Sequence, residues 1–397
     1  MKKQIIISLN VLIIFCSMIG CKNKEKQGPY FIGIVTGTVS SSEDELRAAE
    51  FFMDRYGKYE EGGIVKHSTY PDNYSQEIET TISTIKSFAD DPQCKAIIVV
   101  PAVPGTAAAF AEIKKTRPEI LLFSAFSHED WRVSTQSVDL QLGMNNVARG
   151  YLMMQVAKKL GAKNFVQISP PYSLGIESIS RRMAVMKQVG EELGITFSLE
   201  ISPDPRLDGV PSAQQFIIEQ MPIWVERYGK ETVFYTTLEC QTEPLLRQVA
   251  DLGAFFIEAD LPGPLNGYPG AFGVELKDVA GNWPAILQRV EEAVVAYGGG
   301  GRMGTWAYSV NYTAVVALAE LAKRTIDGEA DYKNQEDLIA CFSEYSAADT
   351  WKAAFFIYVD GTVIQNYRVV YQDTYIFGLG SQKTIDEEVP QKYYTIK

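Results

Sequence analysis

The chain has 397 residues, of which 46% are hydrophobic and 22% charged, and its formal net charge is −12. A globular composition of this length can build two domains, each with a core of its own. The acidic balance argues against nucleic acid as a partner, because phosphate contacts need a basic surface. The five cysteines and two histidines show no spacing typical of a metal site, so no metal is expected.

The N-terminus reads as an export signal. A basic start precedes a mostly apolar segment, 5–19, that is too short for a stable membrane span. The segment ends in Gly20-Cys21, which resembles the bacterial lipobox with Met18 where leucine is usual. The resemblance implies removal of residues 1–20 and lipidation of Cys21, with an uncleaved anchor as the alternative. Both place the protein outside the cytoplasm on a membrane tether, followed by a polar linker at 21–29.

Strand and helix patterns then alternate. Apolar, β-branched runs predict strands at 31–35, 64–69, 94–100 and 120–124, and helices are expected from Ser42, near 78, and at 107–116. Ser42 and Glu45 form the pattern of a capping box, which predicts the start of the first helix. Strands with this apolar pattern predict a parallel sheet with helices on both faces.

A second series of βα units follows a crossing segment at 138–145. Strands are expected at 164–169, 195–201, 232–237 and 254–258, and helices at 146–160, 175–193, 212–228, 243–252, 284–297 and 309–326. Asp360-Gly361 predicts a hairpin within 355–364. We therefore expect two Rossmann-like, doubly wound lobes joined by hinge crossovers. The expected first lobe comprises 30–140, about 305–330 and part of the C-terminus; the second comprises 141–300, and 350–380 form a hairpin and terminal segment.

Four loop stretches carry a family resemblance. They are Ile32-Gly-Ile-Val-Thr-Gly-Thr-Val, Thr69-Tyr-Pro-Asp-Asn, Ala102-Val-Pro-Gly-Thr-Ala-Ala-Ala and Asn266-Gly-Tyr-Pro-Gly-Ala. With the two α/β halves, the chain resembles an uncharacterised bacterial lipoprotein family, a domain of unknown function with the type I periplasmic-binding-protein fold. This resemblance implies two lobes that close on a small solute. It carries over no site residue, because the family's ligand is not known.

Candidate binding residues follow the strands, since ligands of open α/β sheets sit beyond the carboxyl ends of the strands. In the first half these residues are Thr36, Thr38, Ser40, Ser41, Tyr70, Asp72, Asn73, Gly105 and His128. Hydroxyls and amides at a helix start suit a carboxylate, phosphate or sugar. A tyrosine beside Asp-Asn suits a sugar ring, nucleoside or amino acid. The alternatives are helix capping by the serines, a simple turn at 70–73 and a solvated loop at His128.

The second half offers acids and aromatics at the equivalent loop ends. These candidates are Tyr172, Glu239, Asp260, Tyr268 and Trp306. Glu239 and Asp260 could recognise hydroxyl or ammonium groups, although either could be a solvated surface acid. Trp306 could form a lid on the ligand where the chain returns between the lobes, although aromatic residues are more often part of the core.

Neither histidine stands in a catalytic motif, and the chain has no nucleophile elbow, phosphate loop or zinc-protease motif. We therefore expect a binding protein and not an enzyme, with no cofactor. The sequence favours a membrane-anchored extracytoplasmic solute-binding lipoprotein that hands a small polar metabolite to a membrane permease or sensor. A receptor subunit of a membrane sensor kinase is the alternative, and an enzyme acting in the same cleft is a weaker one.

Overall fold

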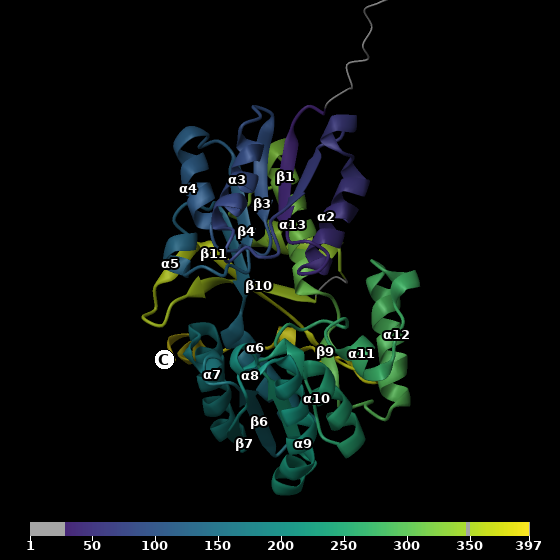
Figure 1. Cartoon of the computed structure of the whole chain (residues 1–397). Coiled ribbons are helices and arrows are strands. Elements are labelled where there is room, and N and C mark those ends of the chain that lie inside the picture. Colours follow the sequence, from purple (N-terminus) through teal and green to yellow (C-terminus); the bar gives the residue numbers. More distant parts are fainter. Residues whose placement is uncertain (1–27, 347–349, 397) are drawn as a thin grey trace, which may run out of the picture.

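The chain folds into two α/β lobes, one above the other in Figure 1. A computed structural model describes residues 28–346 and 350–396, so the lipidation candidate Cys21 lies outside the described residues. The predicted fold class, two Rossmann-like lobes joined by crossovers, is confirmed.

The first lobe contains a seven-stranded sheet in the order β10-β11-β5-β4-β3-β1-β2. Its strands are β1 (Phe31–Thr36), β2 (Val65–Thr69), β3 (Cys94–Val99), β4 (Leu121–Ala125), β5 (Leu140–Met144), β10 (Trp351–Ile357) and β11 (Val363–Gln372). β10 is antiparallel to β11, and the other pairings are parallel. Alternate residues of β1 face opposite sides, so Ile32 joins one core cluster and Phe31 another.

Helices cover both faces of this sheet. α2 (Glu43–Tyr56), α13 (Val310–Asp327) and α14 (Gln335–Glu344) pack on one face, and α3 (Ile78–Ala89) and α4 (Thr106–Thr116) pack on the other. The short helix α5 (Trp131–Ser134) follows β4. The sheet is therefore buried on both sides, which accounts for the continuous apolar runs in its strands.

The second lobe is built around β7-β6-β8, a parallel sheet formed by β6 (Asn164–Ser169), β7 (Thr196–Ile201) and β8 (Thr232–Thr236). Single bridges at Phe255 and Phe256 connect it towards β9 (Gly304–Trp306), which pairs with β12 (Thr374–Ile376) and then β13 (Gly380–Ser381). The helices are α6 (Asn146–Lys159), α7 (Glu177–Leu193), α8 (Pro205–Asp208), α9 (Val210–Tyr228), α10 (Glu239–Leu252), α11 (Tyr268–Phe272) and α12 (Trp283–Ala296).

Within residues 28–346 and 350–396, three crossovers connect the lobes. The chain leaves the first lobe between β5 and α6, returns between β9 and α13, and leaves again between β11 and β12. The crossovers are hydrogen-bonded to one another. The Asn145 amide donates to the Val370 carbonyl at 2.8 Å, and the Gln372 side chain accepts from the Tyr308 amide at 3.0 Å. The three connections therefore form one hinge region.

Asp373 stabilises the third crossover just beyond β11. Its carboxylate is buried and accepts hydrogen bonds from the Lys383 amide at 3.0 Å and the Thr384 amide at 2.7 Å. The hydroxyls of Ser381 and Thr384 also donate to it. One carboxylate thus ties the crossover to the segment after β13, where the backbone amides would otherwise lack partners.

Several local predictions differ from the structure. Ser42 occupies the N-cap position of α2, but its side chain makes no capping hydrogen bond, so the predicted capping box does not form. The Ser42 hydroxyl instead lies close to Gly37, where a Cβ on residue 37 would come within 2.5 Å of the hydroxyl oxygen. The expected crossing segment at 138–145 is mostly β5, and only bridges occupy the expected strand at 254–258.

Two further properties concern the described residues as a whole. Between 28 and 396, apart from 347–349, no helix has both the length and the apolar character needed to cross a membrane. Cys94, Cys240 and Cys341 are free thiols, as the sequence favoured.

We predict that Asp373→Ala destabilises the protein by about 3 kcal/mol, because buried amides lose a charged acceptor. Urea unfolding followed by circular dichroism measures the change. Asp386→Ala, an exposed acid nearby, is the matched control and should change the free energy of unfolding by less than about 0.5 kcal/mol. Equal effects of the two substitutions would contradict the role of Asp373.

Candidate functional site

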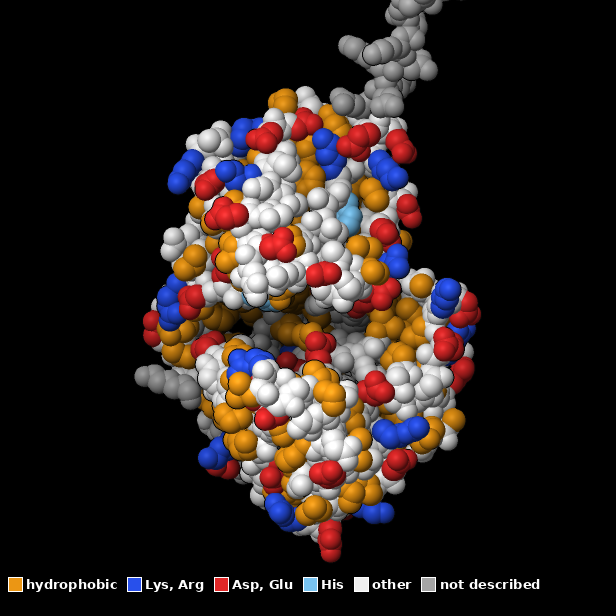
Figure 2. Space-filling view, viewed as in Figure 1, with side chains coloured by type: hydrophobic (Ala, Val, Ile, Leu, Met, Phe, Trp, Pro, Cys, Tyr) orange, Lys and Arg blue, Asp and Glu red, His pale blue; other side chains and the backbone are white. Residues whose placement is uncertain are grey.

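A cleft opens between the lobes, and acidic and hydrophobic side chains line its walls (Figure 2). Two cavities in this cleft are each lined by residues of both lobes. The larger, of about 460 Å³, lies between the loop after β4, the β10–β11 hairpin and the start of α7. The smaller, of about 280 Å³, lies between the starts of α2, α10 and α13. We call them the aromatic cavity and the acidic cavity after the side chains that line them.

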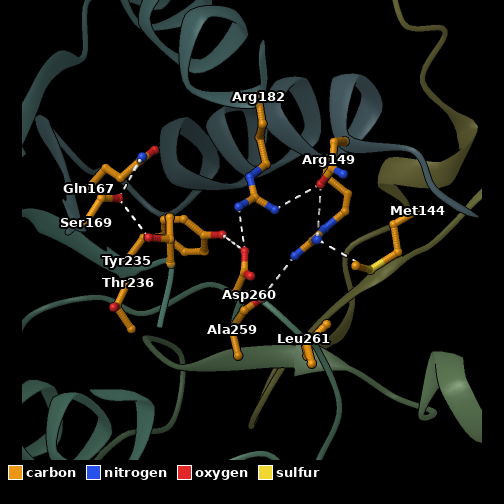
Figure 3. A network of polar contacts seen from close by, with 12 residues as sticks. Met144, Arg149, Gln167, Ser169, Arg182, Tyr235, Thr236, Ala259, Asp260 and Leu261 are labelled. Atoms are coloured by element: carbon orange, nitrogen blue, oxygen red, sulfur yellow. Dashed lines mark hydrogen bonds and ion pairs between the residues drawn. The ribbon is translucent and has the colours of Figure 1, made fainter. Parts of the chain in front are cut away.

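A network of buried charges lies in the second lobe beside Asn146 and Leu261, which line the two cavities. Figure 3 shows its Arg149, Arg182 and Asp260 side chains. Arg149 on α6 pairs with Glu258 at 2.8 Å, and the two side chains are only 1% and 2% exposed. Trp306 Nε1 donates to the other Glu258 oxygen at 2.8 Å. Because both charges are desolvated, this pair depends on full hydrogen bonding, which Trp306 and the Ala259 carbonyl complete.

Asp260 belongs to the same network and precedes Leu261, which lines the acidic cavity. Its Oδ1 accepts from Arg182 Nη2 at 2.5 Å and from the Tyr235 hydroxyl at 2.6 Å. Burial opposes ionisation, but the guanidinium groups of Arg182 and Arg149 hold the pKa of Asp260 below its usual range. Asn146 accepts from Arg182 Nη1 at 2.9 Å and so orients that guanidinium. Arg182 and Tyr235 therefore hold the Asp260 carboxylate in a fixed position beside the acidic cavity.

The acidic cavity gathers carboxyl groups from both lobes. In the first lobe, Asp44 accepts from the Ser309 hydroxyl, and Glu45, just behind it on α2, accepts from Asn311 Nδ2 at 2.6 Å. In the second lobe, Glu239 at the start of α10 lines the same cavity. Burial raises the pKa of all three carboxyls, and their mutual repulsion adds to the effect for Glu45, whose pKa rises to about 7.

The first two strand-end loops meet at Asp72. Its carboxylate accepts from the hydroxyls of Thr38 at 2.5 Å, Ser40 at 2.7 Å and Ser41 at 3.0 Å. These hydrogen bonds lower the pKa of Asp72. Four of the candidates singled out in the sequence are thus direct neighbours, and they form an exposed polar cluster where β1 and β2 end.

Other candidates occupy different positions. Thr36 is buried and shares a hydrogen bond of 2.9 Å with His67, Tyr70 is buried, and Asn73 contacts Gln76 in its own turn. Gly105 precedes α4, and its amide donates to Glu129 at 3.3 Å. His128 lines the aromatic cavity, and the Arg206 guanidinium stacks on Tyr172 at 3.4 Å.

Two aromatic candidates belong to the core. Tyr268 is buried and donates its hydroxyl to the Gly304 carbonyl at 2.5 Å. Trp306 is 1% exposed and bonded to Glu258, so it does not form the lid that the sequence suggested. In both cases the polar atom of the ring has an internal partner, which allows full burial.

Several residues of this region were not predicted from the sequence. Asp44, Gln141 and Arg181 line the cavities, and Glu45, Arg149 and Arg182 form hydrogen bonds with other lining residues. Arg149 lies in the first turn of α6, and Arg181 and Arg182 lie in the second turn of α7, where charged side chains usually face solvent. Glu45 carried a signal, but that signal was interpreted as a capping box. Across the described residues, no group of three or more His, Cys, Asp or Glu side chains is arranged to hold a metal ion.

Comparison with known proteins identifies the family. A model of proteins of unknown function, DUF3798, matches residues 30–304, and a second family model matches residues 315–396. The chain belongs to the DUF3798 family. Two uncharacterised proteins of Treponema pallidum are 34% and 32% identical to it, over 53% and 52% of this chain and 95% and 98% of theirs. The predicted membership of an uncharacterised family is therefore confirmed.

Solved structures extend the comparison of the fold. A Clostridium difficile protein provisionally described as a transcriptional regulator aligns with a TM-score of 0.79 at 24% identity, over 88% of this chain and 99% of that one. A protein described as a sugar ABC transporter from Actinomyces odontolyticus aligns with a TM-score of 0.50 at 10% identity, over 93% and 99%. This DUF3798 protein therefore has the two-lobe fold of type I periplasmic binding proteins.

We predict that Glu45→Gln stabilises the protein at pH 8 and leaves its stability nearly unchanged at pH 4. The pKa of Glu45 in the folded state, about 7, lies above the ordinary value of 4.5. The contribution of protonated Glu45 to the stability of the wild type is therefore complete below pH 4.5 and is lost as the pH rises through 7. Glutamine keeps an acceptor for Asn311 and removes the charge. The expected gain at pH 8 is up to about 3 kcal/mol.

Urea unfolding at pH 4, 6 and 8 measures this effect. Glu43→Gln, an exposed carboxylate in the same first turn of α2, is the matched control because it also removes a negative charge from the helix N-terminus. A Glu45→Gln difference that does not grow with pH would contradict the role assigned to burial.

Proposed function

We propose that this protein is a membrane-anchored extracytoplasmic receptor that closes on a small polar solute between its lobes and releases it unchanged. The observation that supports this most directly is the open cleft, which has fixed charged groups on both walls and a single hinge behind it. Two lobes connected in this way can rotate towards each other around a ligand. A membrane partner, either a permease or a sensor, would then recognise the closed form.

The carboxyl groups of the cleft favour a ligand rich in hydrogen-bond donors. Asp44 and Glu239 approach the acidic cavity from opposite lobes, and Asp260 presents a carboxylate oriented by Arg182. Closure would bring these groups together and remove their remaining water, which is unfavourable unless donors replace it. Hydroxyl or ammonium groups of a solute would supply those donors, so closure would depend on the ligand.

The comparisons support the receptor assignment at the level of the fold. The Actinomyces odontolyticus protein is described as a sugar ABC transporter, and its chain aligns over nearly its whole length. The Clostridium difficile protein is described as a transcriptional regulator. We do not carry this role over to the present chain, because its N-terminus resembles an export signal with a lipobox-like end. The same features support a position on the outer side of a membrane, with attachment through Cys21.

We predict that protein purified without added ligand retains a small polar molecule, which native mass spectrometry detects as an adduct. Small-angle X-ray scattering should show a smaller radius of gyration with this ligand than after its removal. Asp260→Asn and Glu239→Gln should each weaken its binding about tenfold or more, because each removes a charged acceptor.

Asp278→Asn is the matched control for these substitutions, since it removes an exposed carboxylate that pairs with Arg289 outside the cleft. It should leave the affinity unchanged by isothermal titration calorimetry. Chemical conversion of the ligand would indicate an enzyme. An unchanged radius of gyration on binding would contradict closure.

We predict that Cys21→Ser moves the protein from the membrane fraction to the soluble fraction of a bacterial host that processes lipoproteins. The substitution removes the thiol that would carry the lipid. Detergent phase partitioning and the mass of the mature N-terminal peptide report the change. Cys240→Ser is the control and should stay with the membrane, whereas a Cys21→Ser protein that also stays there would indicate an uncleaved anchor.

A further inference from the structure

The aromatic cavity differs in chemistry from the acidic cavity at the other end of the cleft. Its volume of about 460 Å³ is within the range of sites for small organic ligands. Aromatic rings form much of its lining, namely Phe126, Trp131, Phe355, Phe356, Tyr367 and Tyr394. A purely hydrophilic solute would leave this aromatic surface without a complementary contact.

The rings form a continuous wall. Phe356 stacks on Tyr367 with centroids 4.6 Å apart, and Trp131 packs against Phe356 at 5.8 Å. Gly143 on β5 makes room for this wall, because a Cβ there would lie 2.5 Å from the Tyr367 hydroxyl oxygen. Flat rings held in fixed positions suit another planar group.

Two residues that line this cavity each have one buried polar atom without a partner among the described residues. Gln141 is 1% exposed and its Oε1 has no hydrogen-bond donor, while Arg181 is 5% exposed and its Nε has no acceptor. Buried polar atoms are nearly always hydrogen-bonded in folded proteins. A ligand that donates a hydrogen bond to Gln141 Oε1 and accepts one from Arg181 Nε would give both atoms a partner.

Arg181 sets the charge preference of the cavity. Its two Nη atoms donate to the carbonyls of Ile357 and Tyr394, and Glu177, which is about half exposed, lies 3.7 Å away. The other acids of the lining already have partners: Glu129 accepts from amides at the start of α4, and Asp130 pairs with Arg132 at 3.0 Å. Burial lowers the pKa of His128, so its ring is neutral at pH 7.

We propose that the aromatic cavity binds a planar aromatic carboxylate that donates a hydrogen bond from an N–H or O–H group to Gln141 and whose carboxylate accepts a hydrogen bond from Arg181. This inference rests on the proposed function, because it names the ligand class of the same cleft. The aromatic group stacks on the wall formed by Trp131, Phe356 and Tyr367. The polar groups of the solute extend towards Asp260 and the acidic cavity.

Indole-3-acetate is a suitable probe, because it combines a planar ring, one N–H donor and a carboxylate. Isothermal titration calorimetry should detect its binding to the full chain after removal of retained ligand. 1-Methylindole-3-acetate lacks the N–H group and should bind about tenfold more weakly. Indole-3-ethanol lacks the charge and should lose at least as much affinity.

Variants assign these differences to individual residues. Gln141→Leu should weaken indole-3-acetate about tenfold and abolish the difference between it and its N-methyl analogue. Arg181→Met should remove the preference for the carboxylate over the alcohol, and the ligand series in the wild-type protein gives the same test if this variant does not fold. Gln382→Leu, which removes a buried glutamine outside the cleft, is the matched control and should bind like the wild type.

The outcomes separate this inference from the receptor proposal. If a polar solute binds and closes the lobes while no indole probe binds, the aromatic site is wrong and the receptor proposal stands. If indole-3-acetate binds with the expected dependence on Gln141 but the radius of gyration does not change, the site stands and closure is wrong. Equal affinities for the N-methylated and parent probes, or equal losses in Gln141→Leu and Gln382→Leu, would overturn the assignment.

Discussion

The buried ion pair between Arg149 and Glu258 is the interaction on which the geometry of the cleft depends. Arg149 follows the first crossover, and Glu258 accepts from Trp306 just before the second. Loss of one partner would leave an uncompensated charge in the core beside the hinge. The pair thus fixes where both crossovers enter the second lobe, and Asp260, two residues after Glu258, lies beside the acidic cavity.

The two cavities of the cleft differ in chemistry. In the acidic cavity, the Glu239 carboxyl of the second lobe is close enough to contribute to the raised pKa of Glu45 in the first lobe. In the other cavity, aromatic rings surround a guanidinium whose hydrogen-bonding capacity is incompletely used. A solute that matches both ends must combine donors with a flat, anionic group. This division would give selectivity, because a ligand that fits only one end leaves polar groups at the other unpaired.

Much of the fold could be predicted from local patterns, because strands buried on both faces have continuous apolar runs and helices repeat about every 3.6 residues. The Asp72 cluster could also be predicted from the sequence, since its members follow two neighbouring strands. The charge network was not, because Arg149 and Glu258 are 109 positions apart and neither stands in a motif. Burial of Tyr268 and Trp306 likewise depends on partners that only the tertiary structure supplies.

Arg181 also has a mechanical consequence. It belongs to α7 in the second lobe, yet one of its nitrogens donates to Ile357 at the end of β10 in the first lobe, 2.9 Å away. Rotation of the lobes therefore changes the length of this bond directly, unless β10 moves together with α7. The Arg181 guanidinium thus forms a direct contact between the two lobes at a distance from the hinge. The angle between the lobes is therefore coupled to the position of a side chain that lines the aromatic cavity.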